Sequence, residues 1–290
     1  MNTGPSMKWL FIFPSALLIL AFQVSPCEGQ MIVAHRGASY DAPENTLAAF
    51  RLAWEQQSDG IEGDFYLTAD DRIVCIHDPD TQRTAGVKRM VEESSLAELR
   101  ELEYGSWKDP RWHGEQIPTL REVWETVPDR KLFVIELKSK ESIAPLLADQ
   151  LRSLDDGRIR VLIISFHEET AAACKALMPA TRVHWLTKFR PHETGPTFHP
   201  DVATVAETIK RLGVDGVGMR AQREVIDLAF TQALTQMDCR EFHVWTVDSI
   251  DDAKYFQTLG AMGITTNRPA HIRTALISTA LKAREMVGQP

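Results

Sequence analysis

The feature that most constrains the fold of this chain is a regular alternation of short apolar runs with stretches of helical periodicity. The apolar runs predict strands at 31–35, 60–67, 132–137, 160–165, 182–187, 214–219, 241–247 and 261–265. Helices are expected between and after them, at 44–57, 120–127, 142–154, 168–178, 200–212, 223–236, 250–259 and 269–286. Eight alternating units in about 260 residues predict a parallel sheet that closes into a (β/α)8 TIM barrel, an α/β fold.

An open, doubly wound sheet is the alternative architecture for the same order of elements. Its usual cofactor loop is a G-x-G-x-x-G that follows the first strand. That loop is absent here, because Gly37 stands alone after Arg36. The closed barrel is therefore the favoured prediction.

One stretch, at about 78–118, interrupts the alternation and contains no clear strand. It includes a turn-rich aromatic segment at 104–114. Residues 68–72, just before it, predict a hairpin turn between the second strand and the apolar run 73–77. We expect a small insertion between the second strand and the second helix, on the loop face of the barrel, where substrate selectivity is set.

Residues 1–29 have the order of a secretory signal peptide rather than of a barrel element. Lys8 precedes an uncharged apolar run at 9–24, and a segment of small and polar residues follows at 25–29. The run of 16 residues is shorter than the roughly 20 needed to cross a bilayer. We therefore expect one domain, residues 30–290, that is secreted or periplasmic and not inserted in a membrane once the leader is removed; a membrane anchor is the weaker alternative.

The chain is acidic, with 32 Lys and Arg against 40 Asp and Glu and a net charge of −8. This balance argues against nucleic-acid partners, because phosphate backbones are held mainly by clustered positive charge. An anionic substrate must then be met by a local cationic site. Outside the leader, Cys75, Cys174 and Cys239 do not cluster, so neither a disulfide scaffold nor a zinc site is predicted. No protein partner is evident from the sequence.

Charged side chains appear where several of the predicted strands end. These residues are His35, Arg36, Glu62, Asp64, His77, Glu136 and Lys138. Strand side chains alternate between faces, so Glu62 and Asp64 share one face, as do Glu136 and Lys138. Each group alone has a structural explanation, such as an ion pair or a buried hydrogen-bonded histidine. Together they predict one active site, because the carboxyl ends of barrel strands meet at a single face.

The residue types indicate the chemistry of this site. Glu62, Asp64 and Glu136 offer hard carboxylate oxygens, which suit Mg²⁺ or Ca²⁺ better than zinc or copper. Arg36 and Lys138 would bring positive charge beside that metal, an arrangement suited to a phosphate oxyanion. The site therefore predicts a divalent cation, Ca²⁺ or Mg²⁺, next to a phosphate.

Two histidines complete the predicted chemistry. The pKa of imidazole lies near neutrality, so His35 and His77 can act as a base and an acid on either side of a phosphorus atom. Together with a metal and two cations, this pair describes the cleavage of a phosphodiester.

These residues resemble the glycerophosphodiester phosphodiesterase family. The resemblance rests on segments spread over most of the chain after the leader: His35-Arg36-Gly37-Ala38, Pro43-Glu44-Asn45-Thr46, Ala49-Phe50, Glu62-x-Asp64, Thr68-x-Asp70, His77-Asp78, Ile117-Pro118-Thr119-Leu120, Glu136-x-Lys138, Trp245-Thr246-Val247 and Thr265-Thr266-Asn267-Arg268-Pro269. It implies a barrel that binds a divalent cation and hydrolyses glycerophosphodiesters to sn-glycerol 3-phosphate and an alcohol.

Matched position by position, the resemblance implies that His35 accepts a proton and His77 donates one. The other implied roles are metal ligation by Glu62, Asp64 and Glu136 and phosphate contact by Arg36 and Lys138.

The resemblance extends, less specifically, to the surroundings of these residues. Glu44 is expected just outside the metal ligands, and Asn45 is expected to cap the first helix. Trp245 is expected to form an apolar wall for glycerol, with ordinary barrel core as the alternative. Asn267 stands where the family commonly has Asp.

The remaining histidines receive no catalytic role. Those in loops or unpatterned positions are expected to be solvated or structural: His113, His184, His192, His199 and His271. His243 alternates with Trp245, so it could face the barrel interior.

Three other functions remain open at this point. One is a phospholipase C- or D-like phosphodiesterase acting on an intact phospholipid, although 78–118 contains no long apolar loop and so favours a soluble deacylated substrate. Another is a glycosidase built on two carboxylates such as Glu62 and Glu136, which would leave both histidines and both cations without a role. The third is a noncatalytic secreted lipid-binding protein.

Overall fold

The computed structural model describes residues 1, 30–192, 195 and 197–276. The expected signal peptide, residues 1–29, lies outside the described residues except for Met1, and so does the end of the last expected helix, 277–286.

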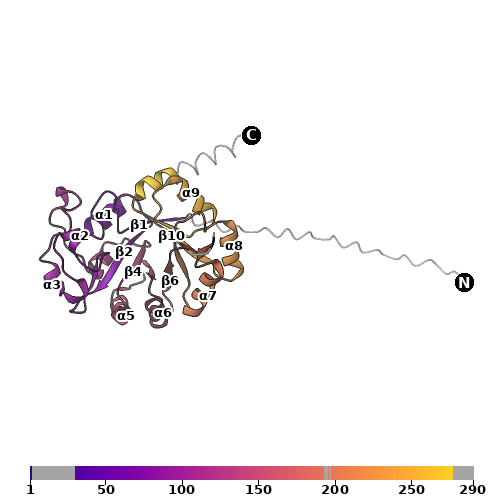
Figure 1. The fold of residues 1–290 in the computed structure, drawn as a ribbon, viewed down its shortest axis with the longest axis horizontal. Helices are drawn as coiled ribbons and strands as arrows, with labels where there is room; N and C mark the ends of the chain where they lie inside the picture. The colour runs from indigo at the N-terminus through magenta and orange to yellow at the C-terminus, as the bar shows by residue number, and fades with distance from the viewer. Residues whose placement is uncertain (2–29, 193–194, 196, 277–290) are drawn as a thin grey trace.

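Eight parallel strands close into a barrel that is surrounded by helices (Figure 1). In their order around the barrel they are β1 (Met31–His35), β11 (Gly263–Thr266), β10 (Glu241–Trp245), β9 (Gly216–Arg220), β6 (Arg182–Thr187), β5 (Arg160–Ser165), β4 (Leu132–Leu137) and β2 (Gly60–Leu67). The ring is closed because β2 also pairs with β1, with His35 beside Glu62. This closure confirms the predicted (β/α)8 TIM barrel and excludes the open sheet.

Helices cover the outside of the barrel. They are α1 (Leu47–Glu55), α4 (Leu120–Glu125), α5 (Ile143–Leu154), α6 (Glu168–Leu177), α7 (Val202–Leu212), α8 (Leu228–Gln236) and α9 (Ile250–Thr258), and residues 269–276 are also helical. Helices α1 and α8 begin three and five residues later than predicted, each at a side-chain cap that satisfies a free backbone N–H. Thr46 accepts from the backbone N–H of Ala49 before α1, and Asp227 accepts from that of Phe230 before α8.

The second βα unit is longer than the others. β3 (Ile73–Cys75) folds back antiparallel to β2, which places Phe65 opposite Cys75 as the hairpin pattern predicts. The segment after it forms α2 (Gln82–Ala85), η1 (Val91–Glu93), α3 (Leu96–Leu99) and η2 (Pro110–Trp112) before α4 begins. These short elements pack around a separate small apolar cluster: Tyr66, Val74, Ile76, Val91, Leu99, Tyr104 and Ile117.

Another short hairpin follows β6. It consists of β7 (Arg190–Pro191) and β8 (Phe198–His199), which pair antiparallel before α7.

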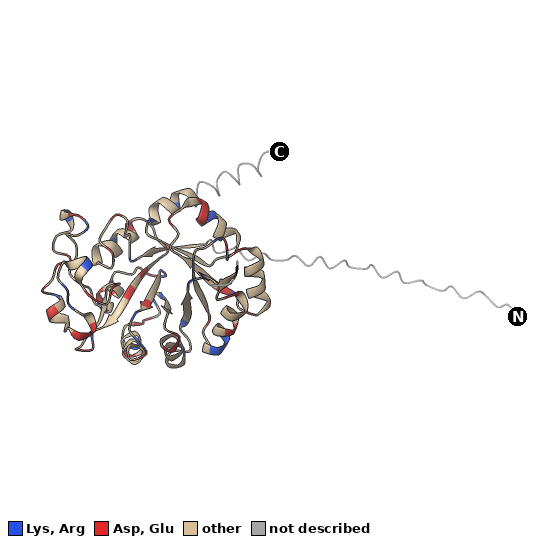
Figure 2. Ribbon diagram, in the orientation of Figure 1, with Lys and Arg blue, Asp and Glu red and all other residues tan. Residues whose placement is uncertain are grey.

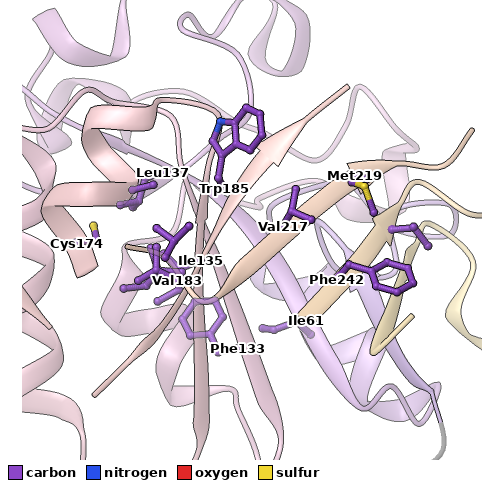
Figure 3. Close-up of a cluster of buried hydrophobic side chains, with 14 of the residues drawn as sticks. Ile61, Phe133, Ile135, Leu137, Cys174, Val183, Trp185, Val217, Met219 and Phe242 are labelled. Carbon is purple, nitrogen blue, oxygen red and sulfur yellow. The ribbon is translucent and has the colours of Figure 1, made fainter. Parts of the chain in front are cut away.

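Apolar side chains form two layers, one on each face of the barrel strands. The larger layer lies between strands and helices and includes Phe133 and Ile135 of β4 and Val183 of β6 (Figure 3). The smaller layer lies inside the barrel and includes Val134. Because strand side chains alternate, the next interior position of β4 after Val134 is Glu136, at the carboxyl end of the strand. The charged residues at the strand ends thus continue the interior face of the barrel at the carboxyl end of its strands.

No helix in the described part of the chain is long and apolar enough to span a bilayer. Cys75, Cys174 and Cys239 are buried and free.

Candidate active site

The charged residues at the strand ends line one pocket at the carboxyl end of the barrel. The pocket is lined by His35, Arg36, Glu62, His77, Glu136, Lys138, Ile164, Phe166, His243, Trp245 and Thr265. These residues come from or follow β1, β2, β3, β4, β5, β10 and β11. The structure therefore brings together residues that are more than 200 positions apart in the sequence, as the barrel closure requires.

Three carboxylates form a compact group at the bottom of this site. Oxygen atoms of Glu62, Asp64 and Glu136 all lie within 4.8 Å of one another. The residues are 2%, 0% and 8% exposed, respectively. In Figure 2, acidic segments are visible on β2 and β4 in the middle of the fold, away from the acidic residues of the outer helices.

The three carboxyl groups have shifted pKa values: those of Glu62 and Glu136 are raised, and that of Asp64 is lowered. Burial and the neighbouring charges of Asp64 and Glu136 raise the pKa of Glu62 well above its usual value. Burial and Asp64 likewise raise the pKa of Glu136 to about 7. Burial alone would raise the pKa of Asp64 too, but Lys138 and Arg36 lower it. Without a further positive charge, the group therefore holds its full negative charge only at a cost in free energy.

Two cations flank the carboxylates. The Arg36 Nε lies 3.1 Å from an Asp64 oxygen, and the Lys138 Nζ lies 2.7 Å from a Glu136 oxygen and 3.3 Å from the other Asp64 oxygen. Burial alone would lower the pKa of Lys138, but Asp64 and Glu136 raise it, so its ammonium group stays protonated. Both cations line the pocket and are available to an anionic substrate there.

Glu44 lies one step away from the carboxylate group. It accepts hydrogen bonds from Arg36 at 2.8 Å and from Arg83 at 2.7 and 2.9 Å. Its contact with the group runs through Arg36, which also pairs with Asp64. Arg83, in the insertion, has no sequence signal that would have marked it as part of this network.

His35 is held on one side of the pocket. Its Nδ1 lies 2.7 Å from the side-chain oxygen of Asn267, and its Nε2 lies 4.0 Å from a Glu62 oxygen. Burial and the charge of Arg36 lower the pKa of His35 to about 4. The imidazole is therefore neutral near pH 7 and can accept a proton.

His77 occupies the more open side of the pocket, with about a third of its side chain exposed. Its Nδ1 lies 2.7 Å from a carboxylate oxygen of Asp78, to which it donates. The other Asp78 oxygen accepts from the Nε of Arg83 at 2.6 Å. This arrangement fixes the ring and leaves the Nε2 of His77 toward the other side, where a substrate oxygen can reach it.

The structure corrects the prediction for Asn45. Asn45 does not cap the first helix, because that role belongs to Thr46. Its amide nitrogen donates to Asp64 at 2.8 Å, and its amide oxygen accepts from the backbone N–H of Asp64 at 3.2 Å. Asn45 therefore orients one of the three carboxylates. Its position directly after Glu44 was the only signal for this role.

Aromatic side chains close another side of the pocket. Trp245 lines it and packs edge to face against Phe166, with ring centroids 5.4 Å apart. The Nε1–H of Trp245 has no hydrogen-bond partner among the described residues. Phe166, which follows β5, carried no functional signal in the sequence.

The other histidines fall into two groups. Four are exposed, as predicted: His113, His192, His199 and His271; His167, which follows β5, is exposed as well. His184 is different, because it lies in β6 rather than in a loop and is fully buried. His243 lines the pocket, which agrees with its expected interior position.

The carboxylate group fits a divalent cation. One oxygen of Glu62 is buried without any hydrogen-bond partner among the described residues. Buried polar atoms are rarely left unpaired, and three converging carboxylate oxygens are the donor type that Mg²⁺ and Ca²⁺ prefer. A divalent cation would also remove the repulsion that raises the pKa of Glu62 and Glu136.

Comparison with known proteins gives the same result as the geometry. A glycerophosphodiester phosphodiesterase of Caldanaerobacter subterraneus subsp. tengcongensis is 29% identical over 255 residues, which cover 82% of this chain and 94% of that protein. Another, from Bacillus altitudinis, is 31% identical over 243 residues, which cover 82% of this chain and 94% of that protein.

Solved structures show the same similarity. A phosphodiesterase from Oleispira antarctica, in complex with the product sn-glycerol-3-phosphate, has a TM-score of 0.73 at 25% identity and covers 85% of this chain and 96% of its own. A glycerophosphodiester phosphodiesterase from Thermotoga maritima shares the fold, with a TM-score of 0.65 at 22% identity over 84% of this chain and 97% of its own. Residues 35–271 match the sequence profile described as the Glycerophosphoryl diester phosphodiesterase family. The chain belongs to this family.

Proposed function

We propose that the chain hydrolyses glycerophosphodiesters to sn-glycerol 3-phosphate and an alcohol, with a divalent cation bound in the pocket. The observation that carries the proposal is the placement of two cations, Arg36 and Lys138, beside three buried carboxylates in a pocket that two imidazoles line. Family membership makes the chain a phosphoric diester hydrolase. The product bound to the Oleispira antarctica relative supports sn-glycerol 3-phosphate as the product here.

Glu62, Asp64 and Glu136 are the residues that would hold the cation. When bound, Ca²⁺ or Mg²⁺ would neutralise negative charge on the phosphate and its transition state. Arg36 and Lys138 would bind the phosphate oxygens from the sides of the pocket. This set of charges lets an acidic protein bind an acidic substrate.

The environments of the two histidines favour different roles in proton transfer. His35 is buried and its pKa is lowered to about 4, so its Nε2 is free to take the proton of the attacking oxygen. His77 lies on the open side, where Asp78 accepts its Nδ1–H and orients the ring. As the P–O bond to the leaving alcohol breaks, His77 would give its proton to that oxygen.

The size of the pocket favours a small substrate. Its cavity volume is about 60 Å³, well below the several hundred Å³ of sites for drug-sized ligands. Phe166 and Trp245 supply an apolar surface for the carbon chain of glycerol. About a third of the His77 side chain is exposed, so an alcohol head group on its side would leave toward solvent.

The decisive experiment measures the release of glycerol 3-phosphate from glycerophosphocholine by residues 30–290. We expect activity that stops when a chelator is added and returns with Ca²⁺ or Mg²⁺. A panel of head groups and vesicles of phosphatidylcholine would be tested beside it. Activity that survives chelation would contradict the metal assignment, and activity confined to the vesicles would favour an intact phospholipid as the substrate.

We also propose that the chain is exported, as a secreted or periplasmic enzyme. The support is the order of Lys8, the apolar run 9–24 and the small residues that follow it. Fractionation of cells that express the full chain, with and without residues 2–29, would test this. Export of the shortened chain would contradict the role of the leader.

A further inference from the structure

Two imidazoles and a carboxylate form a line through the barrel interior below the pocket. The Nε2 of His184 lies 3.3 Å from a Glu241 oxygen, and its Nδ1 lies 3.1 Å from the Nδ1 of His243. The two rings lie nearly in one plane, with an interplanar angle of 22° and centroids 5.3 Å apart. Glu241 begins β10, at the end of the barrel opposite the active site, whereas His243 is part of the pocket lining.

The neighbouring strand leaves space for these rings. A Cβ atom at Gly216 would lie 2.8 Å from the Nε2 of His184, and one at Gly218 would lie 2.4 Å from the Nε2 of His243. Both glycines belong to β9, where Gly218 lies beside His243 in the register. Any side chain at these positions would displace the imidazoles, so β9 is shaped around them.

The hydrogen bonds along this line fix where the protons are. The hydrogen bond from His184 lowers the pKa of Glu241, so the carboxylate is ionised and must accept from the Nε2–H of His184. An imidazole with a single N–H, which His184 uses at Nε2, has an acceptor at Nδ1. The Nδ1–H of His243 donates to it, which leaves the Nε2 of His243 without a proton.

His243 is itself neutral and its acceptor is unused. Burial and the proximity of His184 lower the pKa of His243 well below its usual value. No hydrogen-bond donor to its Nε2 is found among the residues that the structure describes. Two residues further along β10, Trp245 lines the same pocket, and its buried Nε1–H has no partner among the described residues. A polar ligand group at this end of the pocket would pair with the open acceptor of His243.

We infer that the Nε2 of His243 accepts a hydrogen bond from the terminal hydroxyl of the substrate's glycerol moiety, the one furthest from phosphorus. The inference rests on the proposed function. The phosphate must lie near Arg36 and Lys138, and the head group leaves toward His77. The end of glycerol then extends toward the interior, where His243 lies. A substrate without this hydroxyl would leave the buried acceptor unpaired and would be disfavoured.

The test compares two substrates: glycerophosphocholine and the analogue in which its terminal CH₂OH is replaced by CH₃. We expect the unaltered enzyme to prefer glycerophosphocholine in kcat/KM by about tenfold to a hundredfold. His243→Leu should reduce this ratio to near one, mainly by lowering the rate with glycerophosphocholine. The exposed His271 provides a control, since His271→Leu should keep the ratio. An unchanged ratio in His243→Leu would overturn the inference.

A measurement on the unaltered enzyme covers the case in which His243→Leu fails to fold. With ¹⁵N-labelled histidine, the Nε2 of His243 should give the signal of a ring nitrogen without a proton. This signal should move when sn-glycerol 3-phosphate is added and stay in place with propane-1,2-diol phosphate. A protonated Nε2, or equal responses to both ligands, would overturn the inference. If the unaltered enzyme hydrolyses neither diester, the proposed function fails instead.

Discussion

The Nδ1 of His35 lies 2.7 Å from the side-chain oxygen of Asn267, whose amide nitrogen donates to Asp248 at 2.6 Å. The contact with Asp248 fixes the orientation of the Asn267 amide, because a carboxylate can only accept. The amide oxygen must then face His35, and His35 must donate from Nδ1. The Nε2 of His35 thereby carries no proton and is open for the proposed role of proton acceptor, and the partner at Nδ1 carries no negative charge.

A carboxylate in place of this amide should raise the pKa of His35. In Asn267→Asp, the new charge stabilises the imidazolium, so His35 stays protonated up to a higher pH. Since the base must be unprotonated, the acidic limb of the pH–rate profile should move to higher pH. Profiles of kcat/KM, measured with saturating metal, would show the shift. If the pH–rate profile of Asn267→Asp coincided with that of the unaltered enzyme, Asn267 would not influence the pKa of His35.

Loss of the amide should instead lower the rate at every pH. Asn267→Ala removes the group that fixes the tautomer of His35, and about a 10- to 100-fold loss is typical for such a partner of a functional histidine. Ser39 provides a matched control. Its hydroxyl also donates to the Asn267 oxygen, at 2.9 Å, but this hydrogen bond does not involve the His35 ring. Ser39→Ala should keep most of the activity.

The barrel could be predicted because its strands carry their own signal. The bounds expected for β1, β2, β4, β5 and β6 match the structure, since each is a buried apolar run between polar turns. The less accurate bounds belong to segments where a cap or a glycine decides the start. α8 begins at the cap Asp227 and β9 begins at Gly216, and neither choice is visible in hydrophobic periodicity.

The site was predictable in its strand-end residues but not in the contacts that orient them. The alternation of side chains along a strand is enough to place Glu62 and Asp64 on one face. The partners Asn45 and Asp248 depend on how loops fold over the barrel, which local patterns do not encode. His184 was missed for a related reason: a single buried histidine in a strand looks like core until its neighbours are placed.

Metal binding should raise the thermal stability of the protein. A cation at about 100 times its Kd adds about 2.7 kcal/mol to the free energy of unfolding, which corresponds to a rise in Tm of roughly 5–10 °C for a chain of this size. Glu62→Gln should lose this rise, because it removes a ligand. In the absence of metal, the Tm of Glu62→Gln should also be higher than that of the unaltered protein, because the substitution removes the repulsion from Asp64 and Glu136.

Glu44 is the control for the metal experiment. It is bonded to Arg36 and Arg83 rather than to the carboxylate group, so Glu44→Gln should keep the metal-dependent rise in Tm. Differential scanning calorimetry in a chelator, and then in Ca²⁺ or Mg²⁺, measures both effects. A full metal-dependent rise in Glu62→Gln would show that the cation binds elsewhere.

The raised pKa of Glu136 should make its effect on stability depend on pH. The folded protein holds a proton on this carboxyl up to about pH 7, whereas the unfolded chain releases it near its ordinary value. Stability from this group is therefore gained as pH falls from 8 to 5. Without metal, the free energy of unfolding of Glu136→Gln should exceed that of the unaltered protein by about 1–3 kcal/mol at pH 8. This difference should vanish near pH 5.

Comparison with Glu136→Gln is needed because other groups act in the opposite direction. The lowered pKa values of His35 and His243 remove stability as pH falls below about 6.5. Both proteins contain these histidines, so the difference in their urea denaturation curves cancels that contribution. A difference that is constant from pH 8 to 5 would mean that Glu136 is ionised throughout.

The assignment of His77 as the acid can be tested by changing the leaving group. Choline is a poor leaving group unless its oxygen is protonated, whereas p-nitrophenolate leaves without a proton. His77→Ala should therefore slow the hydrolysis of glycerophosphocholine by about 10²–10⁴, and that of the p-nitrophenyl ester of glycerol 3-phosphate by less than about tenfold. His35→Ala should slow both, because the attacking oxygen must lose its proton in either case.

Asp78 supplies an intermediate case between these variants. It accepts the Nδ1–H of His77 at 2.7 Å but does not line the pocket. Asp78→Asn replaces the carboxylate that accepts the Nδ1–H of His77 by a neutral amide and leaves the ring in place. It should therefore slow the hydrolysis of glycerophosphocholine more than that of the p-nitrophenyl ester, by a smaller factor than His77→Ala. If His35→Ala were the variant that spared the p-nitrophenyl ester, the roles of the two histidines would be exchanged.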